Sequence, residues 1–316
     1  MLEEIVYYVL NMSILSTFVM LVVFLLRRIG KKWFTKNMIV FLWLFVLVRL
    51  LVPFALSSEY SVIGIFDEQF VKTVPIDLPS HSDDTTLLPH LAFSNTIQQA
   101  EDYNPMTYKS STFEDVLQII SWVWLVGVLT VALVIGILTK RFRNSIDMSY
   151  SESWEKYKIF TSKQLTTPIV LGVIRPRIIL PEIMNDEVKE FAILHEVAHI
   201  KRKDNLWKQV VTFATVIHWF NPFCWMMLNQ LSKDIEQACD EKVVRSLAKH
   251  SVKDYAMALV IANEELNNYV TAFSGNQLEQ RIYAIVEFRK LSKIMIGLTI
   301  VIYIVLSIVL MTNGLE

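Results

Sequence analysis

Four apolar stretches, each long enough to cross a membrane, constrain this chain more than any other feature. They are Ile5–Leu26, Met38–Leu56, Leu117–Leu138 and Ile294–Met311. A helix needs roughly 20 mostly apolar residues to cross about 30 Å of hydrocarbon. The composition agrees, because 53% of the residues are hydrophobic and 19% are charged, whereas about 25% are charged in soluble globular proteins. We therefore expect a mainly α-helical membrane protein with four transmembrane helices.

Basic residues predict how these helices are oriented. Clusters of Lys and Arg lie within residues 27–36, 140–143 and 289–293. Such clusters collect on the cytoplasmic side of a membrane, so both chain termini are expected outside. The first stretch is not expected to be a cleavable signal peptide, because Glu3 and Glu4 precede it where a signal peptide carries Lys or Arg.

The four stretches divide the rest of the chain into outer and inner parts. Residues 1–56 are expected to hold two helices joined by a basic cytoplasmic loop. Residues 57–116 contain ten acidic residues and two lysines, and are predicted to form an extracellular loop. Residues 139–292 are numerous enough to form a cytoplasmic domain with its own core. Residues 293–316 are expected to form the fourth helix and a short extracellular tail. A net charge of −1 argues against direct nucleic-acid binding.

The cytoplasmic segment changes its pattern from strand to helix. Residues 162–181 consist of β-branched runs interrupted by Pro and Gly, which predicts a strand or hairpin with an unpaired edge. Apolar residues then recur with a period of 3.6 residues on one face with His195 and His199. This period predicts a helix that starts near Asn185 or Asp186.

That helix contains the pattern H-E-x-x-H at residues 195–199. Two histidines four residues apart lie on one helix face and can bind the same Zn²⁺. Glu196 lies beside them, where a general base would take a proton from a metal-activated water. The competing interpretation, two core histidines and a surface glutamate, would bury both imidazoles without an evident partner.

A catalytic zinc ion takes three protein ligands, so the third must come from elsewhere in the chain. The helical stretch Asp234–Glu241 offers Glu236 and Asp240 on one face. We expect Glu236 to bind the metal and Asp240 to orient a histidine. Cys239 is a rival ligand, although a buried reduced thiol is the commoner state of such a residue. Asp234 and Glu241, at the two ends of the stretch, are expected to be solvated surface charges.

The apolar stretch Gln209–Leu228 lies between the two metal-binding helices. A single membrane crossing there would separate His195 from Glu236, so we predict a helical hairpin packed on, or dipping into, the inner leaflet. His218, in its middle, is a candidate for stabilising an oxyanion, with a structural role as the alternative. Asp204, just before it, is a candidate hydrogen-bond partner within the site, with a capping or surface role as the alternative.

These residues resemble the bacterial membrane zinc metallopeptidases of the BlaR/MecR antibiotic sensor–transducer type. The resemblance covers most of the chain and includes the four-helix layout. Its specific motifs lie in four segments, His195–Asp204, His218–Trp225, Glu236–Asp240 and Pro168–Pro181. Together these motifs are far more specific than the metal motif alone.

The resemblance implies a protein of the bacterial plasma membrane that carries a gluzincin-like α+β domain in the cytoplasm. One Zn²⁺ per chain would be held by His195, His199 and Glu236, with Glu196 as the general base. The resemblance also implies self-cleavage, which by position falls within Thr271–Gln280. It further implies signalling that removes a DNA-bound repressor. The expected partners are a cytoplasmic protein substrate of this kind and the lipid bilayer, and a homodimer is compatible with the sequence.

One departure from the sensor members matters. They continue after the fourth helix into a penicillin-binding domain, whereas this sequence stops at Glu316. We therefore expect no β-lactam sensor here and assign the sensing of any external signal to residues 57–116.

Three functions compete at this point. The leading one is a zinc endopeptidase that turns an external signal into cytoplasmic proteolysis, with its substrate added as a strand to an edge within Thr167–Leu180. The second is a constitutive quality-control protease. The third is a non-catalytic receptor or scaffold with a structural zinc. Glu196 argues against the third, because a structural zinc needs no base and usually has a fourth Cys or His ligand.

Overall fold

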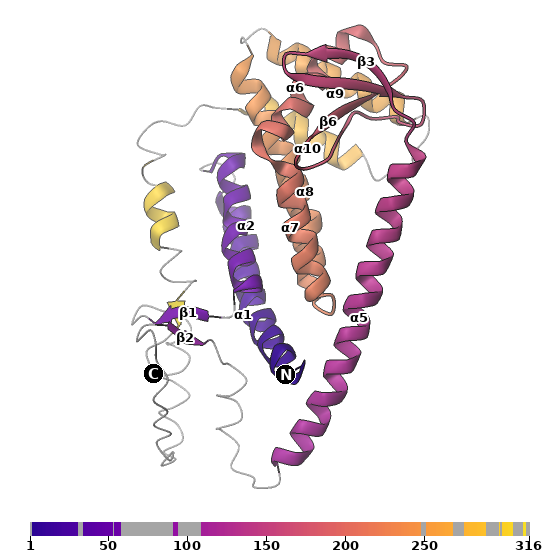
Figure 1. Ribbon diagram of the computed structural model, residues 1–316. Coiled ribbons are helices and arrows are strands. Elements are labelled where there is room, and N and C mark those ends of the chain that lie inside the picture. The colour runs from indigo at the N-terminus through magenta and orange to yellow at the C-terminus, as the bar shows by residue number, and fades with distance from the viewer. Residues whose placement is uncertain are drawn as a thin grey trace.

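The computed structural model describes residues 2–30, 34–52, 54–57, 91–93, 109–247, 251–267, 275–288, 297, 299–305 and 312–313. Its helices are α1 (Leu2–Ile29), α2 (Lys36–Leu51), α5 (Lys109–Ser145), α6 (Asp186–Arg202), α7 (Asp204–Ile217), α8 (Pro222–Ser246), α9 (Ser251–Asn267) and α10 (Gly275–Val286). Its strands are β1 (Phe54–Ser57), β2 (Leu91–Phe93), β3 (Ser149–Trp154), β4 (Tyr157–Ser162), β5 (Ile169–Leu171), β6 (Arg177–Pro181) and β7 (Thr312–Asn313). Helices α1, α2, α7 and α8 run side by side, and α5 passes obliquely along them (Figure 1). An α+β body of β3–β6, α6, α9 and α10 lies at one end.

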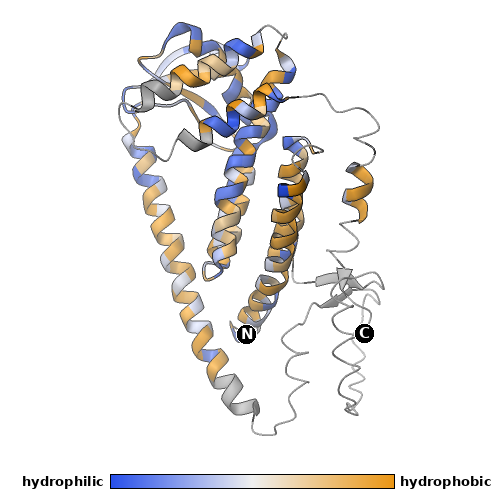
Figure 2. Cartoon of the chain, turned by 180° about the vertical axis from the view of Figure 1, so that it is seen from behind, coloured by the Kyte–Doolittle hydropathy of each residue, from blue (hydrophilic) through white to orange (hydrophobic). Residues whose placement is uncertain are grey.

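Two of these helices are long and apolar enough to cross a membrane. Their apolar segments are Ile5–Ile29 in α1 and Val116–Ser145 in α5, and hydrophobic residues predominate in the middle of both helices (Figure 2). The second predicted stretch is shorter than expected. Helix α2 has 16 residues and ends at Leu51, because the chain is already extended as β1 from Phe54.

Other predicted segments fall mainly outside the described residues. Of the fourth apolar stretch, residues 297 and 299–305 are described, and they are helical. Of the acidic segment 57–116, the described parts are residue 57, β2 and residues 109–116 at the start of α5. Of the predicted self-cleavage segment, residues 275–280 are described, as the first turns of α10.

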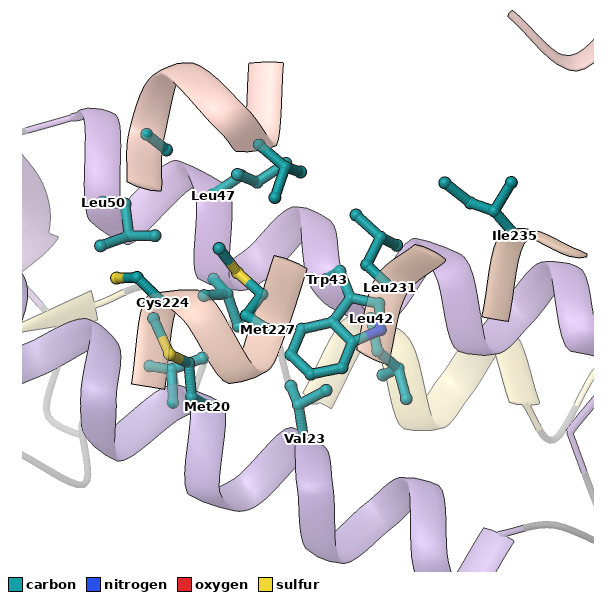
Figure 3. Packing of buried hydrophobic residues seen from close by; sticks show 14 residues of the cluster. Met20, Val23, Leu42, Trp43, Leu47, Leu50, Cys224, Met227, Leu231 and Ile235 are labelled. Carbon is teal, nitrogen blue, oxygen red and sulfur yellow. The ribbon is translucent and has the colours of Figure 1, made fainter. Parts of the chain in front are cut away.

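Helices α7 and α8 form a hairpin that packs against α1 and α2. Side chains from all four helices share one apolar core, with Val211 and Ala214 from α7 and Met227, Leu231 and Ile235 from α8. Figure 3 shows the α8 side chains interdigitating with those of α1 and α2. In a lipid environment such close packing, rather than exclusion of water, holds helices together. The hairpin is thus an integral part of the bundle.

Two acidic residues of α8 bind the hairpin to α1 and α2 at the end away from its turn. Asp234 on α8 accepts a hydrogen bond from Nε of Arg27 at 2.8 Å and one from the Trp43 indole at 3.0 Å. Glu241, two turns further, accepts from the backbone N–H of Lys36 at 2.6 Å. Asp234 and Glu241 are 2% and 8% exposed. The expectation that these two acids are solvated is therefore wrong, because α1 and α2 cover α8 here and supply the donors that a buried carboxylate requires.

The turn of the hairpin contacts α5 through two tryptophans. Nε1 of Trp124 donates to the carbonyl of Ile217 at 2.9 Å, and Nε1 of Trp219 donates to the carbonyl of Trp124 at 3.3 Å. A Cβ atom on Gly127 would lie 2.2 Å from the Trp219 ring. This close approach therefore requires glycine at position 127.

The sheet of the α+β body has the strand order β3-β4-β6-β5. Strands β4 and β6 are parallel, while β3 and β5 pair antiparallel at the two edges. Ile159 of β4 and Ile178 and Leu180 of β6 are buried against Ile193 and Val197 of α6. Of the strand or hairpin predicted within residues 162–181, the structure has the hairpin, formed by β5 and β6, with β5 at an edge. Sequence reasoning missed β3, which is polar and mostly exposed, and β4, which precedes the predicted segment except for Ser162.

Candidate metal centre

Helix α6 begins and ends where its charges and caps predict. The side chain of Asn185 accepts a hydrogen bond from the backbone N–H of Glu187 at 3.0 Å, which caps the first turn. Acidic residues occupy the first turn and basic residues the last, which suits the helix dipole. The helix places His195, Glu196 and His199 in the interior, each 7–8% exposed.

A sharp turn at Lys203 returns the chain toward this helix. Lys203 has a φ of 59°, a left-handed conformation that commonly ends helices. Helix α7 starts at the next residue, Asp204, whose side chain is fully buried. Its Oδ2 lies 2.8 Å from Nδ1 of His199, and Arg202 donates to the same carboxylate at 3.1 Å.

Three ligand atoms from two helices converge at one point. Nε2 of His195 lies 3.1 Å from Nε2 of His199 and 3.3 Å from Oε2 of Glu236. Nε2 of His199 lies 3.6 Å from the same Oε2. Glu236 comes from α8, and its other carboxylate oxygen accepts from Nζ of Lys208 at 3.4 Å. The structure therefore brings together the three residues that sequence spacing named as ligands.

The donor set fits a tetrahedral divalent cation. Zinc–ligand bonds of about 2.0–2.1 Å place neighbouring tetrahedral ligand atoms roughly 3.3 Å apart, close to the three separations measured here. Both Nδ1 atoms face hydrogen-bond acceptors on the far side of the rings. When these nitrogens carry their protons outward, two Nε2 lone pairs and a carboxylate point at one another. Such an arrangement needs a positive charge at its centre.

The outer side of His195 is held by groups from three further helices. Its Nδ1 lies 3.0 Å from the hydroxyl of Tyr255 and 3.3 Å from Oδ1 of Asp240. Tyr255 donates to that Oδ1 at 2.7 Å. Arg281 contacts both oxygens of Asp240, each at 2.8 Å. Asp240 therefore lies where sequence spacing expected it, while Tyr255 and Arg281 were not foreseen.

Glu196 lines a cavity of about 480 Å³ together with two of the ligands, His195 and Glu236. Apolar side chains of α6 and α9 line one side, and Thr167 and Pro168 approach it just before β5. Burial raises the pKa of Glu196, although the nearby imidazoles oppose the rise. A carboxylate with a raised pKa can accept a proton near neutral pH and release it again.

Two other candidate residues lie away from the three converging atoms. Cys239 is buried, and its Sγ lies 3.1 Å from Nδ1 of His199 and donates to Asp204 at 3.0 Å. Burial raises the pKa of the Cys239 thiol to about 12, so it stays protonated beside the outer nitrogen. His218 is at the α7–α8 turn, where its Nε2 donates to the carbonyl of Leu50 at 2.9 Å. The structure does not bring His218 to the cavity, which rules out the oxyanion role considered for it.

The site has the arrangement of a membrane metallopeptidase: an H-E-x-x-H helix, an acidic ligand from a second helix and an adjacent cavity. A match to the BlaR1 peptidase M56 family covers residues 7–285. The chain therefore belongs to this family of metallopeptidases.

Individual relatives agree with the family assignment. The methicillin resistance mecR1 proteins of Staphylococcus aureus and Staphylococcus epidermidis are 27% identical over 341 residues, which covers 96% of this chain and 56% of each relative. The regulatory protein BlaR1 of Bacillus licheniformis is 30% identical over 158 residues, or 45% of this chain and 25% of that protein. The chain thus spans about half the length of the curated mecR1 relatives that it matches.

Proposed function

We propose that this protein is a membrane-embedded zinc endopeptidase that converts an external signal into cytoplasmic proteolysis. The convergence of His195, His199 and Glu236 beside a buried Glu196 and a cavity is the observation that carries the proposal. A structural metal would need neither the base nor the cavity. The family and the relatives, named for methicillin resistance and for regulation, support a role in signalling.

Each site residue has a defined task in this reaction. When bound, zinc supplies Lewis-acid polarisation of the scissile carbonyl and of a water molecule. Glu196 accepts a proton from the attacking water and delivers it to the departing amine. Asp204 holds His199, and Asp240 with Tyr255 holds His195, so that both Nε2 atoms keep facing inward.

The start of β5 is the proposed docking edge for a peptide substrate. Carbonyl groups two residues apart point to the same side of a strand. Those of Val170 and Gly172 already accept from Asn205 at 3.1 and 3.0 Å. Thr167 and Pro168 line the cavity just before them. An extended substrate would therefore add to the sheet at Thr167–Ile169, near the metal ligands.

The proposed topology has four transmembrane helices with both termini outside and the α+β body in the cytoplasm of a bacterium. The two apolar helices α1 and α5 and the basic clusters support it. The bonding of α8 to α1 and α2 keeps Glu236 on the same side as α6. The proposed substrate is a cytoplasmic protein, either a transcriptional repressor or the protein itself.

Substitution of the base tests this function. Purified wild-type protein and Glu196→Gln are loaded with zinc and incubated with cytoplasmic repressors encoded near the gene. Loss of a general base should slow cleavage about 10²–10⁴-fold while the zinc content stays at one ion per chain. Glu190→Gln, an exposed acid on the same helix, is the matched control. Full cleavage by Glu196→Gln would refute the proposal.

A further inference from the structure

We propose that Arg281 on α10 is a positioning residue, which holds the metal ligand His195 in place through Asp240. The proposal rests on the metal site described above. Arg281 contacts Asp240 with two nitrogens, Nε and Nη2, each at 2.8 Å. This forked contact fixes the plane of the carboxylate as well as its charge. Asp240 and Tyr255 in turn face Nδ1 of His195.

The two histidines are supported in different ways. His199 is held by Asp204, which accepts a hydrogen bond from Arg202, and both residues lie within five positions of it in the sequence. The groups that hold His195 come instead from α8, α9 and α10, which are 45 to 86 residues away in sequence. Every group that holds His195 therefore depends on tertiary packing, whereas the carboxylate that holds His199 is local and the Cys239 thiol of α8 is its long-range neighbour.

Arg281 is needed because Asp240 is buried. The Asp240 side chain is 1% exposed, and that of Arg281 is 22% exposed. Without the guanidinium, the carboxylate would keep one phenol and one imidazole as partners. A buried charge that loses its partner is strongly unfavourable. The carboxylate would then reorient toward other donors, and the hold on His195 would loosen.

The same helix also forms part of the cavity. Leu278, Gln280 and Arg281 of α10 line it together with Val188 and Phe191 of α6. Docking of α10 therefore completes the cavity wall and the support of His195 at once. A shift of α10 would weaken metal binding as well as substrate binding.

Zinc affinity, measured by competition with a chromophoric chelator, tests the proposal without any cleavage assay. Loss of a group behind a ligating histidine typically lowers metal affinity about 10–100-fold, and this range is expected for Arg281→Gln. The Co²⁺-loaded variant should also show an altered visible spectrum, because the geometry of His195 changes. Arg245→Gln removes an arginine paired with the buried Glu241 on α8 and should change neither property. Wild-type affinity and spectrum in folded Arg281→Gln would overturn the proposal.

Two further variants separate positioning from general stability. Arg281→Lys keeps the charge but loses the fork, and its affinity should lie between those of wild type and Arg281→Gln. If Arg281→Gln does not fold, reduced zinc affinity of Arg281→Lys supports the proposal and unchanged affinity overturns it. Asp240→Asn combined with Arg281→Gln should bind zinc as Asp240→Asn alone does. Additive losses would mean that Arg281 does not act through Asp240.

The two proposals fail separately. A wild-type protein that binds one zinc and cleaves nothing would refute the proposed peptidase function but leave the role of Arg281 intact. A wild-type protein that cleaves its substrate, together with an Arg281→Gln variant of unchanged zinc affinity, would refute only the role of Arg281.

Discussion

Oδ2 of Asp204 lies 2.8 Å from Nδ1 of His199, although the two residues belong to different helices. The left-handed turn at Lys203 makes this contact possible by folding α7 back onto the end of α6. A carboxylate behind a ligating imidazole fixes its tautomer and its direction. Helix α6 thus supplies both histidines and ends in the turn that brings Asp204 against one of them, His199.

Asp204→Asn is expected to weaken zinc binding about 10–100-fold, because an amide supports the neutral imidazole less well than a carboxylate does. The measurement is a chelator competition titration of the purified protein. Asp186→Asn, which alters an exposed acid at the start of α6, is the matched control. Equal affinity of Asp204→Asn and wild type would show that the Asp204 contact has no influence on the ligand.

Zinc affinity should rise steeply with pH. Burial opposes protonation of His199, but hydrogen bonds to Asp204, Cys239 and Glu236 outweigh it and raise the pKa of the metal-free ring to about 12. The pKa of His195 is raised as well: burial opposes this, but the contacts to Asp240 and Glu236 prevail. A metal ion binds neutral imidazole and must displace these protons. Zinc affinity is expected to increase at least about 10-fold per pH unit between pH 6 and 8, because each bound ion releases at least one proton.

Calorimetry in buffers of different ionisation enthalpy provides the check on proton release. The binding heat should vary with the buffer by an amount that corresponds to one or two protons per zinc ion. A binding heat that is independent of the buffer, or an affinity that falls as pH rises, would contradict the assigned protonation.

Arg27→Met should destabilise the helix bundle by about 3 kcal/mol, because it leaves the buried Asp234 carboxylate without its cation. The measurement is thermal unfolding in detergent. Arg28→Met changes the exposed neighbouring arginine and should have little effect. Combining Arg27→Met with Asp234→Leu should recover part of the loss, since no unpaired charge remains. No recovery in the double variant would argue against a charge-based cause.

Gly127→Ala should destabilise the contact between α5 and the α7–α8 turn by about 1–3 kcal/mol, the usual effect of overpacking. The added methyl group would occupy space that the Trp219 ring holds. Gly136→Ala lies on the same helix with no atom within 4 Å of its new Cβ, and should be neutral or slightly stabilising. Thermal unfolding in detergent, followed by circular dichroism, measures the stability of both variants. Equal behaviour of the two variants would exclude close packing at Gly127.

Features that depend on local periodicity were accessible from the sequence. Helix α6, its start near Asn185 or Asp186 and the common face of His195 and His199 follow from spacing over about 15 residues. The choice of Glu236 rested on its spacing from Asp240, and the argument that all ligands of one ion share a compartment then predicted the hairpin of Gln209–Leu228. The unpaired edge predicted for residues 162–181 followed from the prolines of this segment, which cannot donate to a neighbouring strand.

Features that depend on distant contacts were not accessible. Nothing near Tyr255 or Arg281 in the sequence marks them as partners of Asp240, because the contacts form only when α8, α9 and α10 pack together. The acids Asp234 and Glu241 looked like surface charges for the same reason. Helix α2 ended early because an apolar residue such as Phe54 serves equally well in a strand.

Within eight residues, helix α8 carries both the acids that anchor it to the helix bundle and the acids that serve the metal centre. Asp234 and Glu241 bond to α1 and α2, and Glu236 and Asp240, between them, serve the metal ligands. A helix rises about 5.4 Å per turn, so these tasks occupy two turns of one rigid rod. A movement of α1 against α2 would therefore be transmitted through α8 to Glu236 and Asp240, because no flexible segment separates these residues from the anchors.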